Sequence, residues 1–148
     1  MTMQTARHAA REPTFLPFAV AAARATAAEP AEPPLLARAQ VLRRHAEAAD
    51  AAAVDCWTAL LAGCQTSARR VLPSRLRELT EATSLYLGSH CWYGTGSPHR
   101  GRVTAAEARI IDAVHDGDGA EFAEAFAGYD QAVATAVASA HGRTGSHA

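Results

Sequence analysis

The sequence predicts an all-α protein, a single antiparallel or orthogonal bundle of five to six helices. Alanine, the strongest helix former, supplies 37 of the 148 residues and about half of the apolar fraction. Apolar side chains recur at helical spacing along most of the chain, and no strand pattern is visible. The length fits one domain. These observations exclude a β-sandwich or a β-barrel.

The first predicted helix runs from Leu16 to Ala28, with Pro17 in its first turn, where proline is tolerated. The polar residues 1–13 before it lack a helix start, so we expect a disordered tail there. Residues 29–34 contain three prolines and are predicted to form an extended connector between helices.

The middle of the chain predicts three helices. Two of them are expected over 35–49 and 52–65, and Asp50 is interpreted as the cap between them. A longer helix is predicted over 68–89, after the start signal Thr66. Its inner face consists of Leu72, Leu76, Leu79, Thr83, Tyr86 and Leu87.

The composition changes over residues 88–103, where glycines, aromatic residues and two histidines are concentrated. We predict a loop for this stretch. Clustered aromatic residues in a loop are typical of a functional segment, but they also cover the end of a small core. Both interpretations stay open for the cluster of His90, Cys91, Trp92, Tyr93 and His99.

Two spacings of the capping-box type predict the last helices. Thr104 and Glu107 open a helix that we expect to reach about His115. Asp118 and Glu121 open the last helix, which we expect over 120–140. The remaining residues, 141–148, are predicted to be a disordered tail, so the folded domain spans 14–140.

Charge and composition exclude several classes of protein. The formal net charge of −1 argues against a strongly cationic nucleic-acid binder. No stretch has the length and apolarity of a membrane span, and the N-terminal residues make a poor signal peptide. We therefore expect a cytoplasmic protein. All 14 basic residues are arginine, a bias typical of a GC-rich bacterial coding sequence.

Residues 107–130, EARIIDAVHDGDGAEFAEAFAGYD, resemble the last helical hairpin of the FCD domain. That domain is the ligand-binding half of a subfamily of GntR-type transcription regulators, whose members there have roughly the pattern E-H-R-x-I-x-x-A-I-x-x-G-D, with A-M-x-x-H further on. Residues 54–61, VDCWTALL, resemble the D-x-x-F-H-x-x-L helix of the family, with Trp57 in place of its aromatic residue. The order and lengths of the predicted helices also fit.

The chain departs from this family in two respects. The resemblance implies an N-terminal winged-helix domain, for which residues 1–13 leave no room, so we expect no direct sequence-specific DNA binding. Many members also hold a metal through one aspartate and three histidines. Val54, Glu107 and Tyr129 stand at three of these positions, and His90 is the histidine nearest the fourth. A divalent ion needs three or four converging ligands, so we expect no metal and no cofactor.

The resemblance implies a ligand cup between the helices, and it places six residues there: Trp57, Thr58, Tyr86, His90, Glu107 and Tyr129. Several have ordinary alternatives. Glu107 is preferred as the partner of Thr104 in the capping box. Tyr129 is preferred as a core aromatic residue whose buried hydroxyl needs a partner. Thr58 is expected to bond the carbonyl four residues earlier.

Three functional hypotheses follow. The leading one is a stand-alone FCD-like module, a non-enzymatic regulator or accessory protein that binds a small organic molecule or a partner protein. The second is a small helical enzyme, either a tailoring enzyme of specialised metabolism or a metal-dependent one, in which His90, Cys91 or Glu107 acts as acid, base or metal ligand. The third is a structural dimerisation module. A homodimer is compatible with each of them.

Overall fold

The computed structural model describes the backbone of residues 12–146 and the side chains of residues 12–140. The described chain is helical and contains no strand, which confirms the predicted all-α class. Its helices are α2 (Pro17–Ala28), α3 (Pro33–Ala62), α4 (Ser67–Leu87), α5 (Ser89–Tyr93), α6 (Ser97–Asp116) and α7 (Gly119–Ser146). Residues 1–11 of the expected N-terminal tail lie outside the described residues.

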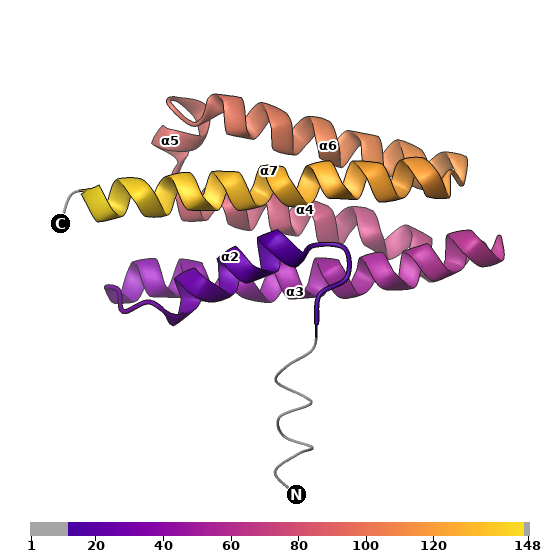
Figure 1. The fold of residues 1–148 in the computed structure, drawn as a ribbon, viewed down its shortest axis with the longest axis horizontal. Helices are drawn as coiled ribbons and strands as arrows, with labels where there is room; N and C mark the ends of the chain where they lie inside the picture. Colours follow the sequence, from indigo (N-terminus) through magenta and orange to yellow (C-terminus); the bar gives the residue numbers. More distant parts are fainter. Residues whose placement is uncertain (1–11, 147–148) are drawn as a thin grey trace, which may run out of the picture.

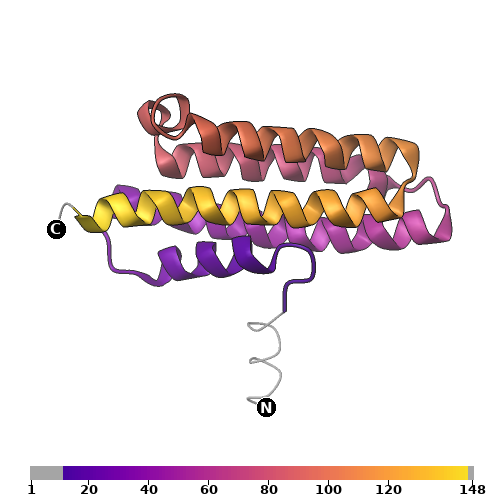
Figure 2. The ribbon, with the colours of Figure 1, turned by 45° about the horizontal axis from the view of Figure 1, so that its top comes forward.

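The four long helices α3, α4, α6 and α7 form an antiparallel bundle in which each helix runs opposite to the one before it (Figure 1). The most extensive packing joins α3 to α4 and α6 to α7. The short helix α2 lies along α3 and α7, and α5 turns the chain at the end of the bundle between α4 and α6 (Figure 2). No helix in the described part of the chain is long and apolar enough to cross a membrane.

Helix α3 is one continuous helix of 30 residues, so the predicted break at Asp50 was wrong. Residues 51–53 are all alanine and favour continuation of the helix. The Asp50 side chain is nearly buried and turns away from the backbone of its own helix, as described below. The helix ends instead at Gly63, which adopts the left-handed conformation with φ of 70°.

The predicted loop over 88–103 was also wrong, because it contains α5 and the first two turns of α6. Helix α6 begins at Ser97 with Pro98 in its first turn, a position that suits proline. Thr104 therefore lies inside the helix, and its hydroxyl donates to the Arg100 carbonyl at 2.9 Å. Thr104 does not cap the helix, and Glu107 is free to contact another element.

The last helix begins where the sequence predicts it. Asp118 precedes α7, and its Oδ1 accepts a hydrogen bond of 3.0 Å from the Glu121 backbone N–H, which confirms this cap. The Glu121 side chain pairs with Arg109 instead of returning to the cap. Helix α7 extends to Ser146, so residues 141–146 are helical and the predicted C-terminal tail over them was wrong.

Two buried aspartates hold the start of α2. Asp50 of α3 accepts hydrogen bonds from the backbone N–H groups of Thr14, Phe15 and Leu16, at oxygen–nitrogen distances of 2.7 to 3.1 Å. Asp130 of α7 accepts from those of Phe18 and Ala19, at 3.1 and 2.7 Å. The first N–H groups of a helix have no partner within the helix, and here carboxylates from two other helices supply one. We call residues 14–19 with Asp50 and Asp130 the clasp.

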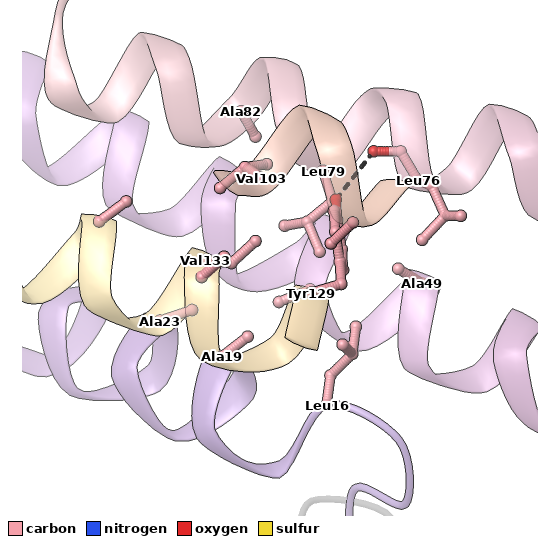
Figure 3. Packing of buried hydrophobic residues seen from close by; sticks show 14 of the residues in the cluster. Leu16, Ala19, Ala23, Ala49, Leu76, Leu79, Ala82, Val103, Tyr129 and Val133 are labelled. Atoms are coloured by element: carbon pink, nitrogen blue, oxygen red, sulfur yellow. Dashed lines mark hydrogen bonds between the residues drawn. The ribbon is translucent and has the colours of Figure 1, made fainter. Parts of the chain in front are cut away.

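The core consists of aromatic residues surrounded by small ones. Phe15 of the clasp lies 5.4 to 5.8 Å, ring centre to ring centre, from Trp57, Phe122 and Phe126. Tyr129 continues this cluster toward the middle of the bundle (Figure 3). Many of the side chains around it are alanine, which lets the helices approach closely. Figure 3 labels four of these residues: Ala19, Ala23, Ala49 and Ala82.

Candidate functional site

The structure does not gather the six predicted pocket residues in one place. Trp57 packs in the aromatic cluster beside Phe15, and Tyr86 is nearly buried at a different level of the bundle, hydrogen-bonded to Thr26 of α2. Thr58 is exposed and donates to the Val54 carbonyl at 3.1 Å, which confirms the bond expected for it. His90 lies exposed on α5. Glu107 and Tyr129 are the two that meet.

Glu107 lines a groove between α4 and α6 that is closed at one end by α5, and Thr80 links it to Tyr129 in the core behind the groove. The groove has a volume of about 360 Å³. We call it the α4–α6 groove. Its lining residues are Arg77, Thr80, Glu81, Ser84, Trp92, Tyr93, Arg100, Thr104 and Glu107.

A chain of hydrogen bonds runs from the core to the floor of this groove. The Thr80 hydroxyl donates to Glu107 Oε1 at 2.7 Å and lies 2.8 Å from the Tyr129 hydroxyl. The Tyr129 hydroxyl also lies 3.1 Å from the Leu76 carbonyl oxygen, to which it donates (Figure 3). The expected core position of Tyr129 is thus confirmed, and its hydroxyl has the partner that a buried phenol requires.

Burial fixes the protonation state of this tyrosine. Tyr129 is fully buried, and loss of hydration raises the pKa of its hydroxyl well above the usual value. The Thr80 hydrogen bond opposes this rise, and the nearby Glu107 charge adds to it. Tyr129 therefore stays a neutral hydrogen-bond donor at neutral pH, and with Thr80 it holds Oε1 of Glu107 in one orientation.

The other oxygen of Glu107, Oε2, has no hydrogen-bond partner among the described residues. The Glu107 side chain is partly exposed to the groove. A carboxylate offers about four acceptor positions on its two oxygens. One oxygen of Glu107 is therefore oriented by the protein, and the other can accept a hydrogen bond from a bound molecule.

Two arginines flank this carboxylate. The side chain of Arg100 is positioned by α5. Its Nε donates to the Trp92 carbonyl at 3.2 Å, and its guanidinium lies 5.2 Å from the centre of the Tyr93 ring. Arg77 of α4 lines the opposite wall. Within the described part of the chain, neither arginine forms an ion pair with an acidic side chain.

The lining of this groove contains few side chains of the kinds that bind metal ions. Its only acidic side chains are those of Glu81 and Glu107, and it contains no histidine or cysteine. Among the residues that the structure describes, no group of three or more histidine, cysteine or acidic side chains could hold a metal ion. The groove can instead supply hydrogen-bond acceptors, guanidinium groups and an aromatic wall.

Among the residues that line the groove, Glu107 and the aromatic residues of α5 are candidates from the sequence, and Tyr129 lies behind them in the core. The sequence did not single out Thr80, Arg77 or Arg100. Thr80 lies beside the inner face of α4, where its position at the edge of an apolar stripe was the available signal. Arg100 was hidden because its helix was interpreted as a loop. With a helix in place, Arg100, Thr104 and Glu107 share one face by their spacing.

Two other grooves lack a comparable hydrogen-bonded floor. One of about 380 Å³ lies between α6 and α7, beside Arg102 and Arg109. Another, of about 530 Å³, lies beside Arg69 and His115, but Arg69 is engaged there with the Val114 carbonyl at the end of α6.

Comparison with known proteins gives no match: no protein-family model, curated protein or solved structure matches the chain.

Proposed function

We propose that the chain is a non-enzymatic helical module that binds a small polar organic molecule in the α4–α6 groove. The observation that carries this proposal is the state of Glu107. Its Oε1 accepts a hydrogen bond from Thr80, which also bonds the buried Tyr129, and its Oε2 has no partner among the described residues, while the residue lines the groove. Binding sites combine a few oriented polar groups with a rigid support, and this is such an arrangement.

The sequence resemblance supports the same proposal from another direction. The hairpin that resembles the FCD domain contributes both Glu107 and Tyr129, and FCD domains are the ligand-binding halves of transcription regulators. We propose that this chain belongs with such sensor modules, as a regulator or accessory protein. The small volume of the groove favours a small molecule over a partner protein as its occupant.

The enzyme hypothesis draws less support from the geometry. Of its three candidate residues, His90 and Cys91 do not line the groove, and Cys91 is nearly buried. Tyr129 is fully buried and cannot reach a substrate. Glu107 would then act alone, without a second acid–base group oriented toward it.

The proposal is tested by a thermal-shift screen of the full chain against free amino acids, sugars, amines and small carboxylic acids. Any compound that raises the melting temperature is then titrated against Thr80→Val, which keeps the shape of the side chain but removes the hydroxyl that orients Glu107. We expect Thr80→Val to weaken binding about tenfold or more, because one oriented hydrogen bond to a charged group is lost.

Thr58→Val is the matched control, because Thr58 is an exposed helical threonine far from the groove that bonds only its own helix. It should bind the compound as the unmodified chain does. Equal affinities of the Thr80→Val and Thr58→Val variants would show that the α4–α6 groove is not the binding site. Circular dichroism of both variants checks that each is folded.

A further inference from the structure

The charges of the α4–α6 groove are arranged in an order that selects one class of ligand. Thr80 contacts Glu107, and α4 runs antiparallel to α6. Arg77, one turn before Thr80 on α4, therefore lies on the side of Glu107 away from Arg100. Arg100 is seven residues before Glu107 on α6, which is about 10 Å along the helix axis. Along the groove, Glu107 thus lies between Arg77 and Arg100.

These charges do not neutralise one another inside the protein. Arg77 and Glu81 have the i, i+4 spacing that allows an ion pair, but the structure shows none between them. Elsewhere on the surface, similar neighbours do pair, such as Arg43 with Glu47 at 3.2 Å. The groove therefore contains positive and negative side chains that do not pair with one another, and Glu107 Oε2 has no partner among the described residues.

The hydrogen-bond donors around Glu107 determine which kind of ligand it can bind. Thr80 has a single hydroxyl proton, and it is donated to Glu107 Oε1. The proton of Tyr129 is shared between the Leu76 carbonyl and Thr80. Among the described residues, none donates a hydrogen bond to the other oxygen of Glu107, so a ligand that binds this oxygen must bring the donor. A protonated amine is the strongest such donor.

The two guanidinium groups complete the requirement. Arginine carries several donors and no acceptor, and it matches the geometry of a carboxylate. Tyr93 offers a largely exposed ring at the α5 end of the groove, 68% accessible to solvent, against which a side chain can pack. We propose that the groove binds a free amino acid, with the amine on Glu107 and the carboxylate on Arg77 or Arg100. This inference rests on the proposed function and specifies its ligand.

The experiment compares each free L-amino acid with its decarboxylated amine and its deaminated acid, by calorimetric titration into the full chain. We expect at least one amino acid to bind, and both of its partial analogues to bind at least about tenfold more weakly, because each has lost one charged contact. Binding of an amine or an acid as tight as that of the parent amino acid would overturn the proposal.

Variants assign the two ends of the ligand. In Glu107→Gln, we expect the amino acid to lose its advantage over the deaminated acid but to keep its advantage over the amine. In the Arg77→Ala and Arg100→Ala double variant, we expect the opposite. Glu124→Gln and Arg70→Ala change exposed residues of the same types outside the groove and should leave both ratios unchanged. A merely structural role of Glu107 would weaken all three compounds equally and would also overturn the proposal.

The failure of this inference can be told from failure of the proposed function. If no amino acid binds but another compound of the thermal-shift screen does so, and Thr80→Val weakens that compound, the groove is a binding site for a different class of ligand. If no compound binds at all, both proposals fail.

Discussion

The clasp and the α4–α6 groove both place carboxylates at the edge of the bundle interior, but they leave them in different states. Asp50 and Asp130 are 6% and 3% exposed, and every one of their oxygens accepts a hydrogen bond from the backbone around α2. Glu107 is partly exposed, and only one of its oxygens has a partner among the described residues. A carboxylate that is fully satisfied by its own chain has no capacity left for a ligand.

The aromatic residues of the two regions differ in the same way. Phe15 of the clasp packs edge-on against Phe122, which is fully buried. Tyr93 of the groove has one arginine near its face and remains largely exposed. The difference indicates that the clasp stabilises the fold and that the groove is available for binding. Changing one carboxylate or one hydroxyl at a time tests whether the two regions differ in this way.

The largest effect is expected from Asp50→Ala. This change leaves three backbone N–H groups without their acceptor, those of the exposed Thr14, the half-buried Phe15 and the buried Leu16. Each unsatisfied buried donor costs about 1 to 3 kcal/mol, so we expect the free energy of unfolding to fall by about 3 kcal/mol or more. Urea denaturation measures this loss.

Asp55→Ala is the matched control, because Asp55 is an exposed acid on the same helix. Its free energy of unfolding should stay within about 0.5 kcal/mol of the unmodified value. A similar small loss for Asp50→Ala would mean that the clasp does not stabilise the fold, and the contrast with the groove would disappear.

The clasp also shows why the sequence predicted the fold class better than its details. Alanine content and helical periodicity depend on local preferences, and these predicted α2 and the cap at Asp118 correctly. An aspartate prefers any helix start that has free N–H groups. The residue type of Asp50 indicates this preference. It does not indicate that Asp50 binds the start of α2, more than thirty residues earlier in the chain.

Glu107 was misinterpreted for a related reason. Its spacing from Thr104 is typical of a capping box, but α6 begins earlier, at Ser97, and so Glu107 contacts α4 instead. Its partner there, Thr80, is one of several polar residues along α4, and its position at the edge of the apolar stripe does not identify it as the partner of Glu107. The registers of α4, α6 and α7 bring Thr80, Glu107 and Tyr129 together, and packing between distant segments sets those registers.

A smaller effect is expected from Tyr129→Phe. The change removes a buried hydroxyl that lies 2.8 Å from the Thr80 hydroxyl and donates to the Leu76 carbonyl, and it keeps the ring in the aromatic cluster. We expect the free energy of unfolding to fall by about 1 kcal/mol, the net value of a typical hydrogen bond. Tyr93→Phe is the control, because that ring is largely exposed, and it should cost less than about 0.5 kcal/mol. Equal losses in urea denaturation would contradict the buried chain of hydrogen bonds.

The smallest effect concerns the pH dependence of the clasp. Burial raises the pKa of Asp130 above its ordinary value of 3.8, and the nearby Asp50 charge adds to the rise, while the N–H groups of Ala19 and Phe18 oppose it. The folded protein therefore binds the proton of Asp130 more tightly than the unfolded chain does. The stability that this provides is present in full below pH 3.8 and is lost as the pH rises through the raised pKa.

Asp130→Asn removes this titration, so its free energy of unfolding should decline less than that of the unmodified chain as the pH rises above 3.8. Urea denaturation at a series of pH values measures the two slopes. Asp112→Asn, at an exposed position of α6, should keep the slope of the unmodified chain. If Asp130→Asn kept it as well, burial would not be penalising the Asp130 carboxylate. A difference in slope would instead mean that the hydrogen bonds of the clasp only partly offset the cost of burying the charge.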